Sequence, residues 1–139
     1  MKKVLVGGVF NIVHPGHVFF LKKSRELGDF LLVVIANDET ARKTKKYAVV
    51  DQRTRKKNIE KLGIADKVVI GDAKDFMKVV RKERPDLIVL GYDQRMKEKD
   101  LKRMLAESGL ECGVTRLRKK LKGYKTSKII KNKENPEEA

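Results

Sequence analysis

The sequence predicts an α/β fold of one domain, built on a doubly wound parallel sheet of five strands. Short apolar runs rich in β-branched residues alternate along the chain with segments of helical spacing, and this alternation is typical of parallel sheets. The length of 139 residues suits one domain. Hydrophobic residues make up 40% of the chain, which is enough to form a core. We therefore expect a single domain over residues 1–131 and a polar, frayed tail over residues 132–139.

The expected strands are short apolar runs that show no polar alternation. Such runs are typical of strands that are buried on both faces of a sheet. They are Val4–Val6, Leu31–Ala36, Lys67–Ile70, Leu87–Leu90 and the weaker Gly113–Leu117.

The expected helices lie between these strands, and each is followed by a glycine or a proline that ends it. They are Pro15–Leu27 before Gly28, Gln52–Leu62 before Gly63, Lys74–Glu83 before Pro85, and Lys97–Ser108 before Gly109. Ligands bind such a sheet at the carboxyl ends of its strands, where the strand order reverses. We therefore expect the ends of the first and fourth strands to face one crevice.

The composition restricts the kind of partner. The chain has 34 Lys and Arg against 19 Asp and Glu, a formal charge of +15, which favours anionic partners. Nucleic acid is disfavoured, because Trp is absent and the basic residues are not interleaved with aromatic ones. The single cysteine, Cys112, excludes an internal disulfide and is expected to be a buried hydrophobe. No apolar run reaches the roughly 18 residues of a membrane span, so we expect a soluble, cytoplasmic protein.

Residues 7–17, which directly follow the first apolar run, carry the most information about function. Pro15 and Gly16 separate His14 from His17, so both imidazoles are expected on one face of the first helical turn. The backbone N–H groups of Gly16 and His17 are expected to point out of the helix N-terminus, which favours phosphates. A zinc site would need a third ligand, and these are the only 2 histidines. The segment therefore predicts a polyphosphate site.

Other polar groups follow the second and fourth expected strands, at the same edge of the sheet. One of Lys43, Lys45 and Lys46 is expected to close over a triphosphate, although a solvated run of charges explains each lysine equally well. Gly91 and Asp93 follow the fourth strand, where a glycine and a carboxylate suit recognition of a ribose or a nucleobase.

Residues 8–17 resemble the signature of the cytidylyltransferase-like nucleotidyltransferases, which reads glycine-x-phenylalanine-aspartate and then histidine-x-glycine-histidine. The resemblance continues at residues 27–29, 38–39, 55, 91–93 and 123–129, and residues 85–94 are especially similar to the archaeal-type FAD synthases. It implies a Rossmann-like fold, a homodimer, and transfer of the adenylyl group of ATP to FMN. It also implies a divalent cation, Mg²⁺, held mainly by phosphate oxygens.

The resemblance also implies roles for individual residues. The predicted catalytic residues are His14, His17 and Lys43, and no side chain is predicted to bind a metal ion. The predicted nucleotide-binding residues are Val9, Phe10, Asn11, His14, Pro15, Gly16, His17, Arg55, Gly91, Asp93, Thr126 and Ser127. Arg55 matches the family arginine better than Arg53 does, and Thr126 suits a helix N-cap as well as a phosphate ligand. Asn11 replaces the usual aspartate, which implies a weaker metal contact there.

Two other functions stay open at this point. A cytidylyltransferase that transfers the cytidylyl group of CTP to glycerol 3-phosphate, or to a similar phosphate ester, fits the same signature. A non-catalytic module that binds a nucleotide or RNA fits the charge of +15.

Overall fold

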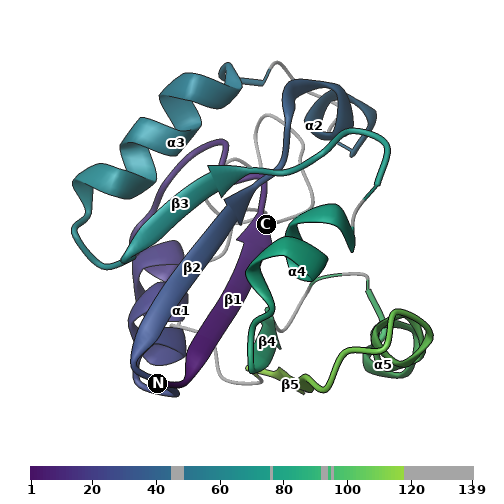
Figure 1. Cartoon of the computed structure of the whole chain (residues 1–139). Coiled ribbons are helices and arrows are strands. Elements are labelled where there is room, and N and C mark those ends of the chain that lie inside the picture. The colour runs from purple at the N-terminus through teal and green to yellow at the C-terminus, as the bar shows by residue number, and fades with distance from the viewer. Residues whose placement is uncertain (45–48, 76, 92–93, 95, 118–139) are drawn as a thin grey trace.

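A parallel sheet forms the centre of the protein, and helices cover both of its faces (Figure 1). The computed structural model describes residues 1–44, 49–75, 77–91, 94 and 96–117. The strands are β1 (Lys3–Gly8), β2 (Phe30–Ile35), β3 (Lys67–Ile70), β4 (Leu87–Leu90) and β5 (Gly113–Arg116). The helices are α1 (Pro15–Arg25), α2 (Asp38–Thr44), α3 (Gln52–Lys61), α4 (Met77–Glu83) and α5 (Glu98–Glu107). The expected tail over residues 132–139 lies outside the described residues.

The strand order is β3-β2-β1-β4-β5, and every pair of neighbours is parallel. The chain moves outward from β1 to β3, then crosses back and continues from β4 to β5 on the other side of β1. The order therefore reverses between β1 and β4, which is the point where such sheets bind ligands. This arrangement confirms the predicted fold class, and the pairing of β1 with β4 brings the ends of the first and fourth strands together.

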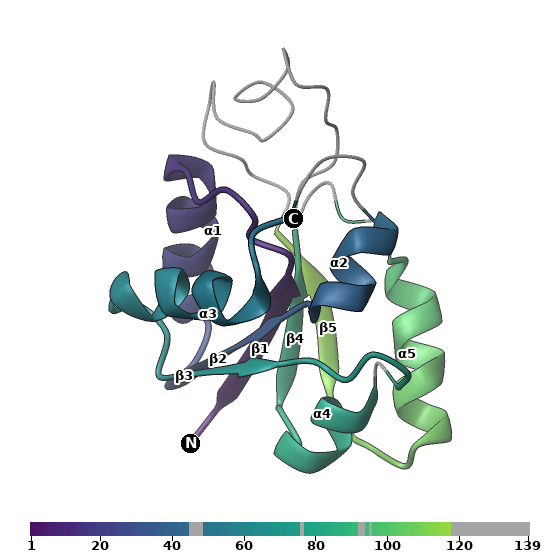
Figure 2. The same cartoon turned by 90° about the horizontal axis from the view of Figure 1, so that it is seen from above.

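The two faces of the sheet have separate hydrophobic cores. Leu21 of α1 and Ile59 of α3 pack with strand residues on one face. Met77 of α4 and Leu101 of α5 pack with strand residues on the other face. Figure 2 shows α1 and α3 on one side of the sheet and α4 and α5 on the other. Because both faces are covered, the central strands β1, β2 and β4 consist mostly of buried apolar residues, as the sequence predicts.

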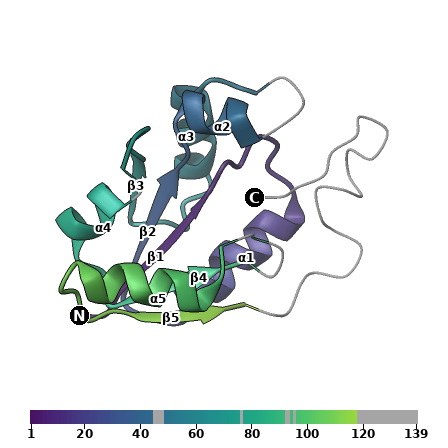
Figure 3. The ribbon, with the colours of Figure 1, turned by 90° about the vertical axis from the view of Figure 1, so that its right-hand side faces the viewer.

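Helix α2 is a difference from the prediction, which places no helix between the second strand and residue 52. The side chain of Asn37 accepts a hydrogen bond from the backbone N–H of Thr40 at 2.8 Å, which is the geometry of an N-cap. Asp38 lies in the first turn and Lys43 in the last, so both charges suit the helix dipole. Figure 3 shows α2 beyond the tip of β2, close to α3.

The predicted ends of the other helices differ from the observed ones by a few residues. Helix α4 begins at Met77 rather than Lys74, because the Asp72 carboxylate accepts from the N–H groups of Lys74 and Asp75 in a turn that precedes the helix. Gly28 does not cap α1, which ends at Arg25. A Cβ at Gly28 would lie 2.6 Å from a methyl of Val4, so this glycine permits close approach to β1.

None of the helices within the described residues is long and apolar enough to cross a membrane.

Candidate functional site

His14 and His17 lie together where the chain leaves β1 and enters α1. Their ring centroids are 3.9 Å apart, and the rings are stacked with an interplanar angle of 26°. Both residues are buried, each with 7% of its surface exposed. The prediction that the two imidazoles share one face of the first turn is confirmed. His14 is the N-cap of α1 and Pro15 is its first residue, as the sequence indicates.

The two histidines close a reciprocal capping box. The Nδ1 atom of His14 accepts from the backbone N–H of Gly16 at 3.0 Å. The Nδ1 atom of His17 accepts from the backbone N–H of His14 at 3.3 Å. A neutral imidazole that accepts at Nδ1 carries its hydrogen on Nε2. The capping box therefore makes the Nε2 atom of each ring a hydrogen-bond donor, which is the chemistry that a phosphate oxygen requires.

Burial supports the same protonation state. Desolvation lowers the pKa of His14 from its ordinary value of 6.5, so the neutral ring is favoured at neutral pH. A proton on either Nδ1 would also abolish a capping bond, because an N–H group cannot accept from a backbone N–H.

One expectation about this helix end is wrong. The N–H of Gly16 does not point out of the helix, because it donates to the His14 ring. The N–H of His17 donates to the His14 carbonyl at 2.9 Å. The backbone N–H groups of Gly16 and His17 are therefore both engaged within the protein.

Phe10 packs against the histidine pair through its contact with His17. Its φ is +51°, a left-handed conformation that costs energy for a bulky residue. Its ring is buried, with 2% of the residue exposed, and meets His17 edge to face at a centroid distance of 5.2 Å. Phe10 thus lies next to the histidine pair, and the predicted contact of Val9 and Phe10 with a nucleotide stays a prediction.

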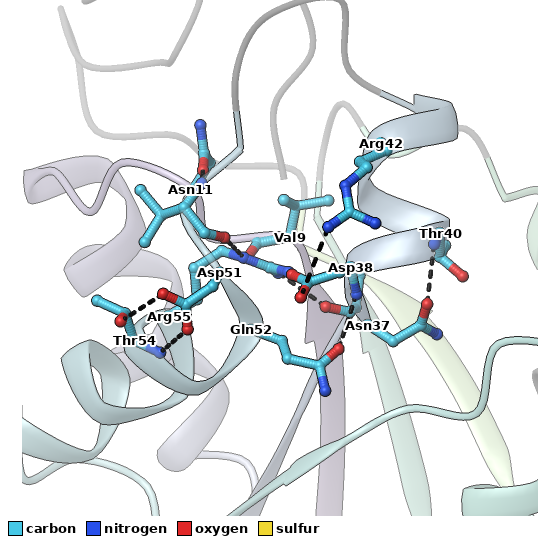
Figure 4. Close-up of polar contacts among 12 residues, drawn as sticks. Val9, Asn11, Asn37, Asp38, Thr40, Arg42, Asp51, Gln52, Thr54 and Arg55 are labelled. Carbon is cyan, nitrogen blue, oxygen red and sulfur yellow. Dashed lines mark hydrogen bonds and ion pairs between the residues drawn. The ribbon is translucent and has the colours of Figure 1, made fainter.

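Arg55, in the first half of α3, is the largest fully buried side chain of the described residues. Its Nη1 donates to the carbonyls of Val9 at 3.0 Å and Ala36 at 2.7 Å, and its Nε donates to the carbonyl of Val50 at 2.6 Å. Its Nη2 donates to the Asp38 carboxylate at 3.0 Å. Figure 4 shows the Arg55 side chain extending between Val9 and Asp38. These contacts are all with protein, although the residue is predicted to bind nucleotide.

Asn11 also contacts the segment that precedes α3. Its Oδ1 atom accepts from the backbone N–H of Val50 at 2.7 Å. Val50 is therefore hydrogen-bonded at both backbone groups: its N–H donates to Asn11 and its carbonyl accepts from Arg55. An aspartate at position 11 could accept the same hydrogen bond, so the replacement of aspartate by asparagine is compatible with this local structure.

Lys43 lies on α2 and is exposed. Its ammonium group is 3.3 Å from the Glu39 carboxylate, one turn earlier, and the structure does not bring it into contact with the histidines. Next to it, Arg42 lies 4.0 Å from Asp38, which links this helix to the buried Arg55. The predicted catalytic role of Lys43 stays a prediction. The alternatives Lys45 and Lys46 lie outside the described residues.

Gly91 directly follows β4, which pairs with β1. Its N–H donates to the Oε1 of Gln94 at 2.6 Å, and the Nε2 of Gln94 donates to the Gly7 carbonyl at 2.8 Å. Gln94 therefore connects the ends of β1 and β4 across the point where the strand order reverses. The Gly91 carbonyl in turn accepts from the Nη1 of Arg116 at 2.6 Å.

Arg116 is a residue that the sequence-based prediction missed, whereas Gln94 lies within residues 85–94 of the family resemblance but was given no role of its own. Besides Gly91, Arg116 donates to the carbonyls of Gln94 and Met96 and to the carboxylate of Glu98. The only signal in the sequence was an arginine in an expected strand, and it does not reveal these acceptors. The predicted site residues Asp93, Thr126 and Ser127 lie outside the described residues.

The fold places the paired imidazoles at a helix N-terminus beside the point where the strand order reverses, which is where α/β proteins of this kind bind ligands. The chain belongs to the cytidylyltransferase-like family, whose sequence profile matches residues 5–132. The predicted membership of this nucleotidyltransferase family is confirmed.

Archaeal proteins named FAD synthase are similar along nearly the whole chain. The one from Thermoplasma acidophilum is 40% identical over 133 residues, which cover 96% of this chain and 94% of the relative. The one from Aciduliprofundum boonei is 42% identical over 119 residues, which cover 86% of this chain and 80% of the relative. The predicted similarity to archaeal-type FAD synthases is therefore confirmed.

A solved structure has the same fold. It is the crystal structure of a protein from Thermoplasma volcanium described as a lipopolysaccharide core biosynthesis protein, with 39% sequence identity and a TM-score of 0.83. The alignment covers 87% of this chain and 98% of that chain.

Proposed function

We propose that this protein is an ATP:FMN adenylyltransferase, which makes FAD and pyrophosphate. The observation that carries the proposal is the stacked pair of imidazoles at the start of α1, in a chain that is 40% identical to an FAD synthase over 96% of its length. The FAD synthase relatives favour ATP and FMN over the other substrates that the signature allows.

In the proposed reaction a phosphate oxygen of FMN attacks the α-phosphorus of ATP. A new P–O bond forms, the bond between the α-phosphorus and the bridging oxygen breaks, and pyrophosphate leaves with the electron pair. The nucleophile is already an anion, so the reaction needs no strong general base. Catalysis then consists of alignment and of stabilising the negative charge that develops in the transition state.

The histidines supply donors for that charge. In the tautomer that the capping box selects, each Nε2–H can donate to a phosphate oxygen of ATP while each Nδ1 stays in the cap. Keeping Nδ1 engaged fixes both rings before substrate binds, and such preorganised donors are the most effective kind. The predicted role of Lys43 as a mobile cation on the phosphates belongs to this proposal as well.

A divalent cation is part of the proposal through the family resemblance. Among the described residues, no group of three or more His, Cys, Asp or Glu side chains could hold a metal ion. As the family resemblance implies, we assign the cation to the phosphate oxygens of ATP, where Mg²⁺ neutralises charge. No step of the reaction is assigned to a side chain acting through the metal.

The test is a matrix of donors and acceptors. ATP or CTP is mixed with FMN or glycerol 3-phosphate and Mg²⁺, and pyrophosphate release and FAD formation are measured. We expect turnover with ATP and FMN, and we expect ATP to raise the melting temperature more than CTP does. Turnover with CTP and glycerol 3-phosphate alone would establish the cytidylyltransferase instead. No pyrophosphate from any pair, together with salt-sensitive RNA binding, would establish a binding module.

The assembly is proposed by resemblance as a homodimer. Sedimentation equilibrium of the full chain with and without ATP tests it, and a monomer at every concentration would contradict it.

A further inference from the structure

Arg55 is predicted to bind nucleotide, but its surroundings describe a different task. The residue has 0% of its surface exposed, and four hydrogen bonds to other protein groups hold its guanidinium. An arginine has five N–H donors, so most of its donors are already directed at protein. A phosphate could take their place only if several of these bonds broke inside a desolvated site, which is costly.

The acceptors of Arg55 come from separate parts of the chain. Val9 follows β1, Ala36 follows β2, and Val50 precedes α3. Three of the four bonds go to backbone carbonyls, so the side chain ties together three segments that meet at the carboxyl edge of the sheet. Asp38 supplies the single carboxylate at 3.0 Å that balances the buried charge.

The bond to Val9 connects Arg55 to the histidines. Val9 immediately precedes Phe10, whose left-handed backbone turns the chain toward α1. The Phe10 ring meets His17 at 5.2 Å, and His17 stacks on His14 at 3.9 Å. The strained Phe10 conformation needs support from its surroundings, and a charge-assisted hydrogen bond to the carbonyl just before it provides that support.

We infer that Arg55 is a positioning residue for the nucleotidyl transfer: it fixes the Val9 carbonyl, and through Phe10 it fixes the ring of His17, without contacting a phosphate. This inference rests on the proposed function for its kinetic part only. Its structural part concerns the ligand-free protein. The same guanidinium also fixes the two ends of the segment that carries Lys43, through Asp38 before it and Val50 after it.

The experiment uses the two histidines as probes. The chain contains 2 histidines and both lie in this site, so the Hε1 region of the proton spectrum has one signal from each. Arg55→Lys keeps the charge but cannot reach all the carbonyls, and Arg55→Gln removes the charge. Arg53→Gln is the matched control, because Arg53 lies on the same helix and is exposed.

In ligand-free Arg55→Lys we expect the His17 signal to shift, because Phe10 moves relative to the ring, while Arg53→Gln leaves it unchanged. We expect kcat to fall about 10- to 100-fold, the effect of a displacement of roughly 1 Å in an active site. The affinity for inorganic pyrophosphate should stay unchanged, since no phosphate contact is lost. Should Arg55→Gln fail to fold, Arg55→Lys carries the test.

The opposite pattern overturns the inference. If the histidine signals of both Arg55 variants match the wild type, and pyrophosphate affinity falls, then Arg55 binds phosphate directly. Failure of the proposed function gives a different result: wild-type protein then makes no FAD from ATP and FMN, while the histidine signals of the ligand-free variants still report whether Arg55 positions the site.

Discussion

Two arginines hold the loops at the carboxyl edge of the sheet, one on each side of β1, and they do so differently. Arg55 has no exposed surface, whereas the side chain of Arg116 is 9% exposed. Arg55 donates to carbonyls of three segments that are far apart in sequence. Arg116 donates to carbonyls of a single segment, between β4 and α5, at Gly91, Gln94 and Met96, and to the Glu98 carboxylate at the start of α5.

This difference shows how the two halves of the site are built. We call the residues around Arg55 the Arg55 half; several segments of the chain meet there. The histidines are part of it, because Arg55 binds the Val9 carbonyl and the next residue, Phe10, contacts His17. In the Arg116 half, Arg116 of the edge strand β5 binds carbonyls that lie between β4 and α5. Gln94 connects this half to β1 through its hydrogen bond to Gly7. A change at Arg55 should therefore spread to the histidines, while a change at Arg116 should stay within its own loop.

The largest expected effect is a difference in protein stability between variants of the two arginines. Arg55→Met leaves the Asp38 carboxylate and several buried carbonyls without their donor, so we expect a loss of about 3–5 kcal/mol in the free energy of unfolding. Arg116→Met should cost about 1–3 kcal/mol, because the Arg116 side chain, unlike that of Arg55, is 9% exposed and water can replace part of its bonding. Urea denaturation of both variants measures the difference, and equal losses would contradict the comparison.

The next prediction concerns turnover. His17→Ala should lower kcat about 10²–10³-fold, the usual cost of removing one transition-state donor. The fold should survive, since the change removes one capping bond while α1 keeps its His14 cap. Circular dichroism and FAD formation are the measurements. Unchanged turnover would remove His17 from the catalytic residues.

The same variant sharpens the comparison through a double-mutant cycle. If Arg55 acts through His17, adding Arg55→Lys to His17→Ala should lower kcat little further. Adding Arg116→Lys should lower kcat by its full single-mutant factor, because that loop acts separately. Multiplicative effects in both cycles would show that Arg55 does not work through the imidazole.

The sequence predicts the elements of this fold well because apolar runs and helix-ending glycines can be recognised from residue identity alone. The paired imidazoles are predictable for the same reason: Pro15 fixes where α1 begins, and a spacing of three residues places His14 and His17 on one face. Gly63 and Gly109 have φ values of +70° and +71°, as helix-terminating glycines should.

The roles of Arg55 and Arg116 are not predictable in this way. Most of their acceptors are backbone carbonyls, and every residue has one, so such a hydrogen bond leaves no trace in the residue types. Helix α2 was missed although Asn37 gives an N-cap signal, because the basic residues after it favour an exposed loop. The capping use of the Gly16 N–H depends on a ring rotamer, which sequence does not specify.

The smallest expected effect is a dependence of stability on pH. We expect it to arise from the Arg55 half alone, because both histidines lie there. Burial lowers the pKa of His14 below its ordinary value of 6.5, so at acid pH the unfolded chain binds a proton that the folded site resists. Stability is then complete above about pH 6.5 and falls as the pH drops toward the lowered pKa. His14→Asn keeps an N-cap acceptor but cannot titrate, so its melting temperature should fall less than the wild type's between about pH 7 and pH 5. Arg116→Lys should keep the wild-type slope, and an unchanged slope in His14→Asn would assign the titration to other groups.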